Sequence, residues 1–195
     1  MEMIRSFIAV DIDDATVLEN LSKIQERLLR TGADLKLVKP ENIHITLKFL
    51  GDITMTMVDQ IYNEMDQVYF GPFEIKIKGI GAFPNLRRIS IVWAGIHQGN
   101  NELRAIFNQL ESRLQTLGFK QDYKGFSPHL TIARVRTGKN KELLVRELNC
   151  LADYEFGTVA AKCLRLKKSV LTPQGPIYSV LRETYGKRLN AQESR

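Results

Sequence analysis

Cysteine, histidine and tryptophan are scarce in this chain, and it contains no long apolar segment. Its 195 residues include two cysteines, three histidines and one tryptophan. Two cysteines cannot form a disulfide framework, and we expect reduced core residues, Cys150 in a helix and Cys163 in a strand. No stretch approaches the roughly 20 apolar residues of a membrane-spanning helix. The first apolar run is too short for a secretion signal and is followed by acids, so the expected location is cytoplasmic.

Charge and hydropathy are those of an ordinary globular protein with a basic excess. Hydrophobic residues make up 44% of the chain and charged residues 26%, which is typical of a soluble fold. The length suffices for one sizeable core or for two small lobes. Lys and Arg number 28 against 22 Asp and Glu, for a net charge of +6. This balance favours an anionic partner such as nucleic acid.

One segment, from Asn42 to Gly51, has a regular two-residue pattern. Apolar residues recur at every second position: Ile43, Ile45, Leu47 and Phe49. Because side chains on a strand alternate between faces, this pattern predicts a half-buried strand with those residues on the core side. The opposite face then carries His44, Thr46 and Lys48.

The same pattern returns from Ser127 to Val135, where His129 and Thr131 share the face opposite the apolar residues. A single His-x-Thr strand is weak evidence, because a histidine on a strand is usually a hydrogen-bonded surface or core residue. Two such strands, with their histidines 85 positions apart, are stronger evidence for a site. The third histidine, His97, lies in a polar segment with Gly at either side, and we expect a loop there.

The order of the expected elements indicates an internal repeat. Helices are expected at 15–30, 54–69, 101–117 and 140–151, and strands at 4–12, 42–51, 73–80, 88–95, 127–135, 158–170 and 177–184, with a loop at 79–85. The two His-x-Thr strands take equivalent places in this order. We therefore expect one domain over residues 1–195, with pseudo-repeats of about 1–84 and 85–185 and a flexible tail at 186–195.

The expected fold class is α+β. A duplicated unit of this kind gives a bilobal fold, in which two pseudo-symmetric halves place antiparallel-rich sheets on a central cleft and helices on the outside. His44 and His129 would then meet across the cleft.

Two facing imidazoles suit concerted acid–base chemistry, because one can be neutral while the other is protonated. Thr46 and Thr131 each supply a hydroxyl two residues further along the same face, which suits a bound phosphate. This chemistry requires no metal and no cofactor. Three other interpretations remain open: zinc ligation, phosphate or nucleotide binding without turnover, and a purely structural pair. Zinc would need a third ligand, and neither cysteine has ligand spacing.

Basic and aromatic residues near these strands fit a nucleotide groove. The candidates are Lys48, Arg134 and Arg136, with Tyr123, Phe126 and Tyr178 as aromatic contacts. Arg87, Arg88 and the run from Arg165 to Lys168 are interpreted as solvated faces, with RNA backbone contact as the alternative.

The chain resembles the two-histidine phosphoesterases, and most closely the LigT-like RNA 2′,3′-cyclic phosphodiesterases, once named 2′-5′ RNA ligases. The segments that carry the resemblance are 5–11, 40–51, 83–84, 126–134 and 175–178, which read RSFIAVD, PENIHITLKFLG, FP, FSPHLTIAR and GPIY. They occur in family order along nearly the whole chain.

The resemblance implies hydrolysis of an RNA 2′,3′-cyclic phosphate to a 2′-phosphate, with 2′-5′ RNA ligation as the reverse reaction. It implies that His44 is the proton donor and His129 the proton acceptor, and that Thr46 and Thr131 hold the phosphate. Weaker substrate contacts are expected from Lys48, Phe126, Arg134 and Tyr178. The expected partners are RNA with cyclic phosphate ends, such as tRNA fragments, or cyclic nucleotides. No membrane partner is expected, and we expect a monomer. The alternative is an RNA-end or nucleotide-binding module without turnover.

Overall fold

The computed structural model describes residues 3–122 and 125–187. In these residues the strands are β1 (Met3–Asp11), β2 (Leu35–Leu37), β3 (His44–Thr54), β4 (Phe73–Asn85), β5 (Arg88–Gln98), β6 (His129–Val135), β7 (Glu155–Ala161), β8 (Leu164–Thr172) and β9 (Gly175–Thr184). The helices are α1 (Ala15–Arg30), α2 (Met55–Asp66), α3 (Asn100–Thr116) and α4 (Lys141–Cys150), with a 3-10 turn, η1 (Pro40–Asn42). The expected α+β class is confirmed.

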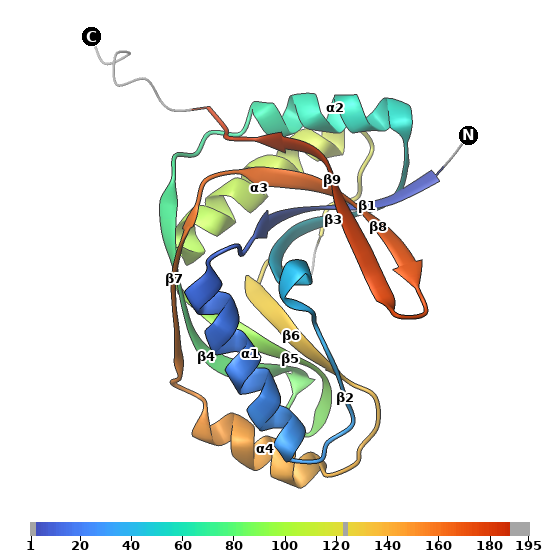
Figure 1. The fold of residues 1–195 in the computed structure, drawn as a ribbon. Helices are drawn as coiled ribbons and strands as arrows, with labels where there is room; N and C mark the ends of the chain where they lie inside the picture. The colour runs from blue at the N-terminus through green and yellow to red at the C-terminus, as the bar shows by residue number, and fades with distance from the viewer. Residues whose placement is uncertain (1–2, 123–124, 188–195) are drawn as a thin grey trace.

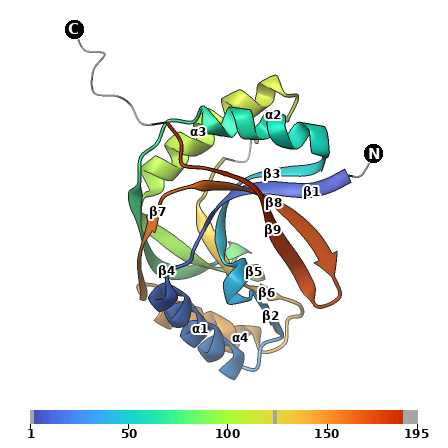
Figure 2. The same ribbon diagram turned by 45° about the horizontal axis from the view of Figure 1, so that its top comes forward.

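The strands form one antiparallel sheet in the order β7-β4-β5-β6-β3-β1-β8-β9, and β2 pairs with β6. The two His-x-Thr strands, β3 and β6, are neighbours at its centre, where Ile45 pairs with Leu130. Helices α2 and α3 lie together at one end of the molecule, and α1 and α4 lie together at the other (Figures 1 and 2). The sheet thus brings both histidine strands to the middle, between the two helix pairs.

The two halves of the sequence exchange strands. β4, from the first half, pairs with β5 of the second half, while β8, from the second half, pairs with β1 of the first. Helix α1 directly follows β1 in the chain, but it packs against strands beyond β3 in the sheet order, β6 and β7. There Gln25 donates to the Ile132 carbonyl of β6 at 2.8 Å. Each end of the sheet is therefore built from both halves of the chain.

Helix α1 begins and packs as its sequence predicts. The side chain of Asp14 accepts a hydrogen bond from the backbone N–H of Val17 and caps the first turn. Its buried residues recur at three- and four-residue spacing: Val17, Leu21, Ile24 and Leu28. Gln25 shares the buried face, where its amide also donates to the Val38 carbonyl at 2.7 Å. These bonds fix the chain that leads into η1 and β3.

Residues 79–85, expected to be a loop, continue strand β4 instead. Their pairing with β5 extends to the hairpin end at Asn85 and Arg88. Gly79 has a φ of +80° and lies at an irregularity in this ladder. Two glycines close together, Gly79 and Gly81, made the sequence of this segment resemble a loop. His97, which we also expected in a loop, lies exposed near the end of β5.

The expected strand 158–170 is in fact two strands, β7 and β8, at different places in the sheet. β7 pairs with β4, whereas β8 pairs with β1. Cys163 lies in the link between them and is half-buried, and Cys150 is exposed at the end of α4. The expectation that both cysteines are core residues is therefore wrong.

The ordered chain also extends into the expected tail. Lys187 exchanges backbone hydrogen bonds with Val68 and Phe70, so Gly186 and Lys187 belong to the folded part. The rest of the expected tail, residues 188–195, lies outside the described residues.

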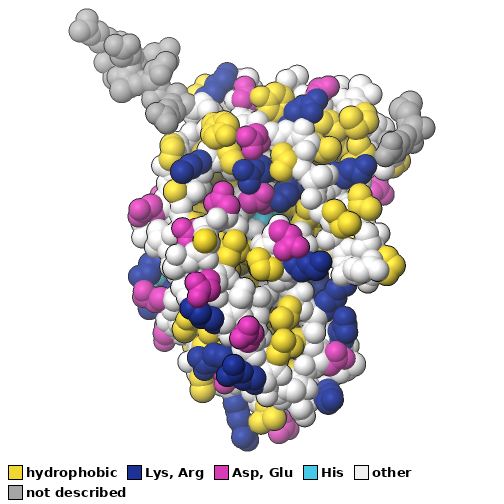
Figure 3. Space-filling model, in the orientation of Figure 1, with side chains coloured by type: hydrophobic (Ala, Val, Ile, Leu, Met, Phe, Trp, Pro, Cys, Tyr) yellow, Lys and Arg dark blue, Asp and Glu magenta, His cyan; other side chains and the backbone are white. Residues whose placement is uncertain are grey.

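Basic and acidic side chains are interspersed on the face shown in Figure 3. The net positive charge is therefore not gathered into one area of that face. In the described part of the chain, no helix combines the length and the apolar character needed to cross a membrane.

Candidate active site

The two histidine rings are anchored in the same way. Nδ1 of His44 lies 2.7 Å from the carbonyl oxygen of Asn42, and Nδ1 of His129 lies 2.8 Å from that of Ser127. A carbonyl oxygen only accepts, so each Nδ1 carries a hydrogen and each neutral ring has its lone pair on Nε2. The backbone two residues before each histidine thus fixes the tautomer. In both rings Nε2 is the atom left to exchange a proton.

Thr46 lies beside the second ring nitrogen of His44, with Oγ1 3.0 Å from Nε2. The hydroxyl donates to Nε2 when the ring is neutral and accepts from it when the ring is charged. Thr131 takes the equivalent place on β6, directly opposite Trp93 of β5. Both threonine side chains are partly exposed, as hydroxyls that bind a ligand must be.

Burial lowers the pKa of His44 in the free protein. The hydrogen bond to Asn42 and the carboxylate of Asp11 oppose this and raise the pKa, whereas the positive charges of Lys167 and His129 lower it. Because the charge of His129 acts on His44, the protonation of one ring affects the other. The charge of His129 thus reaches His44, although it is the smallest of these influences.

Aromatic rings enclose His44. The ring of Phe7 lies 4.9 Å from the imidazole, and that of Tyr178 lies edge-on at 5.4 Å. Tyr178 reaches this position because the β8–β9 hairpin bends toward η1, where Asn42 donates to the Pro176 carbonyl at 3.1 Å. Tyr178, one of our expected substrate contacts, therefore lies beside His44.

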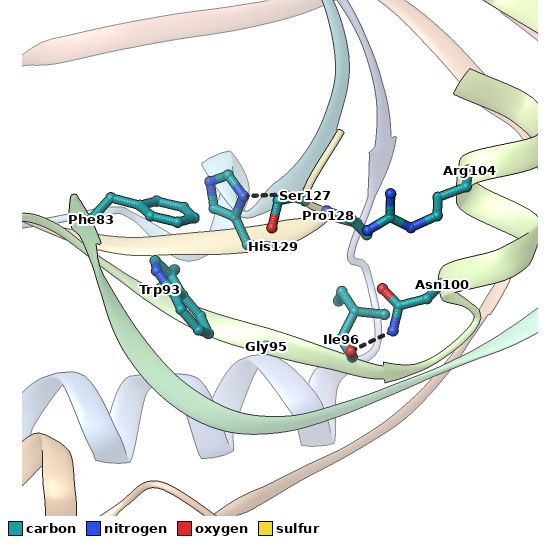
Figure 4. Close-up of a pocket in the computed structure, with 9 residues that line it drawn as sticks. All are labelled: Phe83, Trp93, Gly95, Ile96, Asn100, Arg104, Ser127, Pro128 and His129. Carbon is teal, nitrogen blue, oxygen red and sulfur yellow. Dashed lines mark hydrogen bonds between the residues drawn. The ribbon is translucent and has the colours of Figure 1, made fainter. Parts of the chain in front are cut away.

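A shallow pocket of about 180 Å³ lies beside His129. Phe83 contacts the imidazole edge-on at 4.9 Å, and Trp93 packs against Phe83 at 5.4 Å (Figure 4). On the other side the pocket is bounded by Asn100 and Arg104 of α3. Phe7 and Phe83 were not among our expected site residues, although both lie in segments that carried the family resemblance.

Lys48 does not share the face of His44, contrary to our prediction. Between Thr46 and Lys48 the β1–β3 ladder contains a bulge at Leu47, so that Lys48 lies opposite the fully buried Ile8. A bulge adds one residue and inverts the faces beyond it. Lys48 is consequently buried, with its ammonium paired to Glu111 of α3 at 2.5 Å.

Phe49, which we expected in the core, is turned outward by the same bulge and is 74% exposed. It lies opposite Phe7 in the ladder, with the ring centres 6.2 Å apart. Since Phe7 contacts His44, the exposed ring of Phe49 is on the histidine side of the sheet. It offers a face for a planar group near the site.

The remaining candidates divide into two groups. Arg134 is exposed on β6, after a ladder irregularity at Ile132 that places it on the face of Thr131. Burial raises the pKa of Tyr178, and the charge of Arg134 lowers it. Phe126 instead stacks on Phe107 of α3 at 4.6 Å, and Arg136 pairs weakly with Asp34. Tyr123 lies outside the described residues.

The basic run on β8 is not simply a solvated face. Lys167 is buried, and its Nζ lies 2.7 Å from the carboxylate of Asp11, which Arg165 also binds at 2.9 Å. Nζ of Lys167 also lies 5.8 Å from the ring centre of Tyr178. Sequence reasoning missed this cluster because a run of basic residues usually lies on a solvated face. Within the described ranges, no three His, Cys, Asp or Glu come together as a metal site.

Comparison with protein families decides what kind of protein carries this site. The LigT-like phosphoesterase family model matches residues 10–93 and 96–178, a span that contains both His-x-Thr strands. The chain belongs to the LigT-like phosphoesterase family.

This LigT-like phosphoesterase is similar to a named archaeal protein and to solved structures of E. coli LigT. It is 41% identical over 179 residues to a protein of Methanocaldococcus jannaschii named RNA 2′,3′-cyclic phosphodiesterase, covering 92% of this chain and 99% of that protein. Its fold matches E. coli LigT in apo form, with a TM-score of 0.75, 21% identity, and coverage of 95% and 99%. E. coli LigT complexed with 3′-AMP matches with a TM-score of 0.72 at 21% identity, covering 93% and 97%.

Proposed function

We propose that this LigT-like phosphoesterase hydrolyses RNA 2′,3′-cyclic phosphate ends to 2′-phosphates, using His44 and His129 and no metal. One observation carries the mechanism: both histidines hold Nδ1 on a backbone carbonyl and keep Nε2 for proton transfer. A purely structural histidine pair has no need of matched tautomers. The name of the M. jannaschii relative supports the substrate class.

The proposed reaction is an in-line displacement at phosphorus. Nε2 of His129 takes a proton from water as the water oxygen attacks, and Nε2 of His44 gives a proton to the departing 3′ oxygen. The bond from phosphorus to O3′ breaks, the 2′ ester remains, and the product is a 2′-phosphate. One proton enters at His129 and one leaves at His44, so the pair must exchange protons with solvent before the next turnover.

Thr46 and Thr131 would donate to the non-bridging oxygens, where negative charge is held as the new bond forms. In the free protein Thr46 is engaged with His44 Nε2. The 3′ oxygen of the substrate would replace Thr46 as the partner of that nitrogen, which frees the hydroxyl for the phosphate. In this scheme the two imidazoles supply the general acid and the general base, and the two hydroxyls stabilise the charge on the phosphate oxygens.

Tyr178, Phe49 and Arg134 would contact the RNA end around this centre. Tyr178 borders His44, Phe49 offers an exposed ring beside Phe7, and Arg134 is a solvated cation on the site side. Tyrosine and phenylalanine rings bind bases by stacking, and arginine binds phosphate. E. coli LigT, which has the same fold, has been solved with 3′-AMP, which supports a nucleotide as the kind of ligand. A terminal nucleotide with a 2′,3′-cyclic phosphate is found on short RNA ends, on tRNA fragments and in 2′,3′-cyclic nucleotides, so each of these would fit the proposed site.

The test is incubation of the purified protein, in excess chelator, with a short RNA ending in a 2′,3′-cyclic phosphate. We expect the product to gain one water and to carry a 2′-phosphate that a phosphatase removes. A 3′-phosphate would mean that the bond from phosphorus to O2′ breaks instead, and would contradict the proposed displacement of O3′. Binding without conversion would instead support an RNA-end or nucleotide-binding module. Activity that chelator abolishes would contradict the metal-free mechanism.

A further inference from the structure

The face of the sheet that carries His44 continues along β1, away from the site. Asp11 of β1 lies directly opposite His44 in the ladder. Because side chains alternate along a strand, Phe7 and Arg5 share the face of Asp11. Phe7 contacts the imidazole of His44, and Arg5 lies two residues further on. Arg5 is therefore on the site face, beyond the rings that enclose His44.

Arg5 is an exposed cation that is free to bind a ligand. In the part of the chain that the structure describes, its side chain makes no hydrogen bond or ion pair, although Asp52 of β3 lies directly opposite. Burial raises the pKa of Tyr178, and the charges of Arg134 and Arg5 lower it. The charge of Arg5 thus acts on a ring that borders His44. A guanidinium with free donors is suited to binding a phosphate.

Phe49 lies between Arg5 and the reacting centre on this face. Its ring is 74% exposed and lies opposite Phe7, with the ring centres 6.2 Å apart. An exposed aromatic ring next to a cation is the arrangement with which proteins bind single-stranded nucleic acid, because the ring stacks on a base and the cation binds the backbone. Phe49 and Arg5 therefore match one base and one phosphate.

The length of strand between them separates Arg5 from the reacting phosphate. Thr46, which would hold that phosphate, lies opposite Ala9, and the four residues from Ala9 to Arg5 span about 13 Å. Arg5 is therefore placed for another phosphate of the RNA. The terminal ribose holds the cyclic phosphate through O2′ and O3′, so the rest of the RNA leaves through O5′, away from the reacting centre.

A second direction leads from the site toward Lys36 of β2. Lys36 lies opposite Arg134 in the β2–β6 ladder and shares its face. The turn of the β8–β9 hairpin lies against Lys36, because a Cβ on Gly175 would be 3.8 Å from its Nζ. Lys36 is also half-buried, whereas Phe49 and Arg5 are exposed. The side of Phe49 and Arg5 is thus the more open path for an RNA chain.

We propose that Phe49 and Arg5 bind the second nucleotide from the RNA end. The base of this nucleotide stacks on Phe49, and Arg5 binds the phosphate that joins it to the terminal nucleoside. Asp52 opposes this contact, since its carboxylate repels a phosphate. The inference rests on the proposed function, and it makes the end of an RNA chain a better substrate than a free cyclic mononucleotide.

The test compares two substrates with the same reacting nucleoside: adenosine 2′,3′-cyclic phosphate, and the dinucleotide ApA with a 2′,3′-cyclic phosphate end. In the wild type we expect kcat/KM to be about 10 to 100 times higher for the dinucleotide. In Arg5→Gln this ratio should fall about tenfold, because one charge-assisted contact is lost. In Asp52→Asn it should rise about two- to fivefold, the size of a surface charge effect.

A further substrate separates the base from the phosphate. A dinucleotide whose second nucleotide lacks its base keeps the phosphate for Arg5 but has nothing to stack on Phe49. Its kcat/KM in the wild type should be about tenfold below that of the intact dinucleotide. Phe49→Ala should abolish the difference between the two dinucleotides.

Two variants serve as controls. Arg30→Gln removes another exposed arginine, in the last turn of α1 at the other end of the molecule. Lys36→Gln removes the cation on the second path. Both should keep the wild-type ratio of dinucleotide to mononucleotide.

Three results would overturn the proposal. The first is an equal kcat/KM for the mononucleotide and the dinucleotide in the wild type. The second is a wild-type ratio in Arg5→Gln, and a fall in Lys36→Gln instead would mean that the RNA leaves along β2. The third is a difference between the two dinucleotides that persists in Phe49→Ala. Hydrolysis of none of these substrates would overturn the proposed function itself, so the two failures are distinguishable.

Discussion

Asp11 lies directly opposite His44 in the antiparallel β1–β3 ladder, so the two side chains share one face of the sheet. The carboxylate of Asp11 is held by Lys167 and Arg165 of β8. Asp11 raises the pKa of His44 and Lys167 lowers it. The charges around Asp11 therefore act on the protonation of His44.

The Lys167→Met substitution tests this influence. Removing the positive charge raises the pKa of His44, because a nearby cation disfavours the charged imidazole. As the proposed acid, His44 must be protonated, so activity is lost as pH rises through its pKa. We expect the alkaline limb of the kcat/KM profile to move to higher pH in Lys167→Met and to lower pH in Asp11→Asn.

The matched control for this shift is the double variant Lys48→Met/Glu111→Leu. It also removes a buried lysine and its carboxylate partner, but on the face of β3 opposite to His44. Its pH profile should coincide with that of the wild type. Movement of the acid limb in Lys167→Met, with the alkaline limb fixed, would mean that His44 is the base and would reverse the assigned polarity.

A second prediction concerns the shape of the pH profile itself. One histidine must be neutral and the other charged, so kcat/KM should be bell-shaped. Burial lowers the pKa of His44 in the free protein, whereas a bound phosphate anion should raise it. The alkaline limb should therefore lie at higher pH in kcat, which reports the complex, than in kcat/KM, which reports the free enzyme. A monotonic profile through the histidine range would exclude the paired mechanism.

Substitution of the two histidines tests their cooperation. We expect His44→Ala and His129→Ala each to lower kcat by about 10² to 10⁴. The double variant should lose much less than the product of the two factors, because the residues act as a unit. His97→Ala is the control, since this exposed histidine lies near the end of β5. Near-normal turnover in either single variant would refute the mechanism.

The secondary structure could be predicted where a hydrophobic pattern is regular and local. Helix α1 has the bounds that its pattern indicated, and both histidine strands lie where the alternation placed them. The exchange of β4 and β8 between the halves could not be predicted, because pairing depends on contacts far apart in the chain. Residues 79–85 were misread because glycines in a long irregular hairpin resemble those of a loop.

The two histidines of the candidate site were easier to single out from the sequence than the residues around them. His44 and His129 stand out because the same motif occurs twice, and the residues two positions before each fix its ring. The prediction placed Lys48 on the exposed face of β3 and Phe49 on the buried face, whereas the structure has the reverse. The reason is one extra residue in the ladder, Leu47, which inverts the alternation beyond it. A bulge leaves no mark in a hydrophobic pattern that continues through it. Lys167 was missed because its partner, Asp11, is distant in sequence.

The buried pair of Lys48 and Glu111 leads to the last prediction. Lys48 also donates to the Lys120 carbonyl at 2.7 Å, and Glu111 accepts from the backbone N–H of Asp122, so the pair ties β3 to α3 and to the chain beyond that helix. Lys48→Met leaves a buried carboxylate without its cation and should cost about 3–5 kcal/mol of the free energy of unfolding. The double variant Lys48→Met/Glu111→Leu should recover most of this loss in a urea titration, since replacing both charges removes the desolvation cost. In both variants kcat per folded molecule should stay at the wild-type value. A stable Lys48→Met protein with a raised KM would instead return Lys48 to the substrate site.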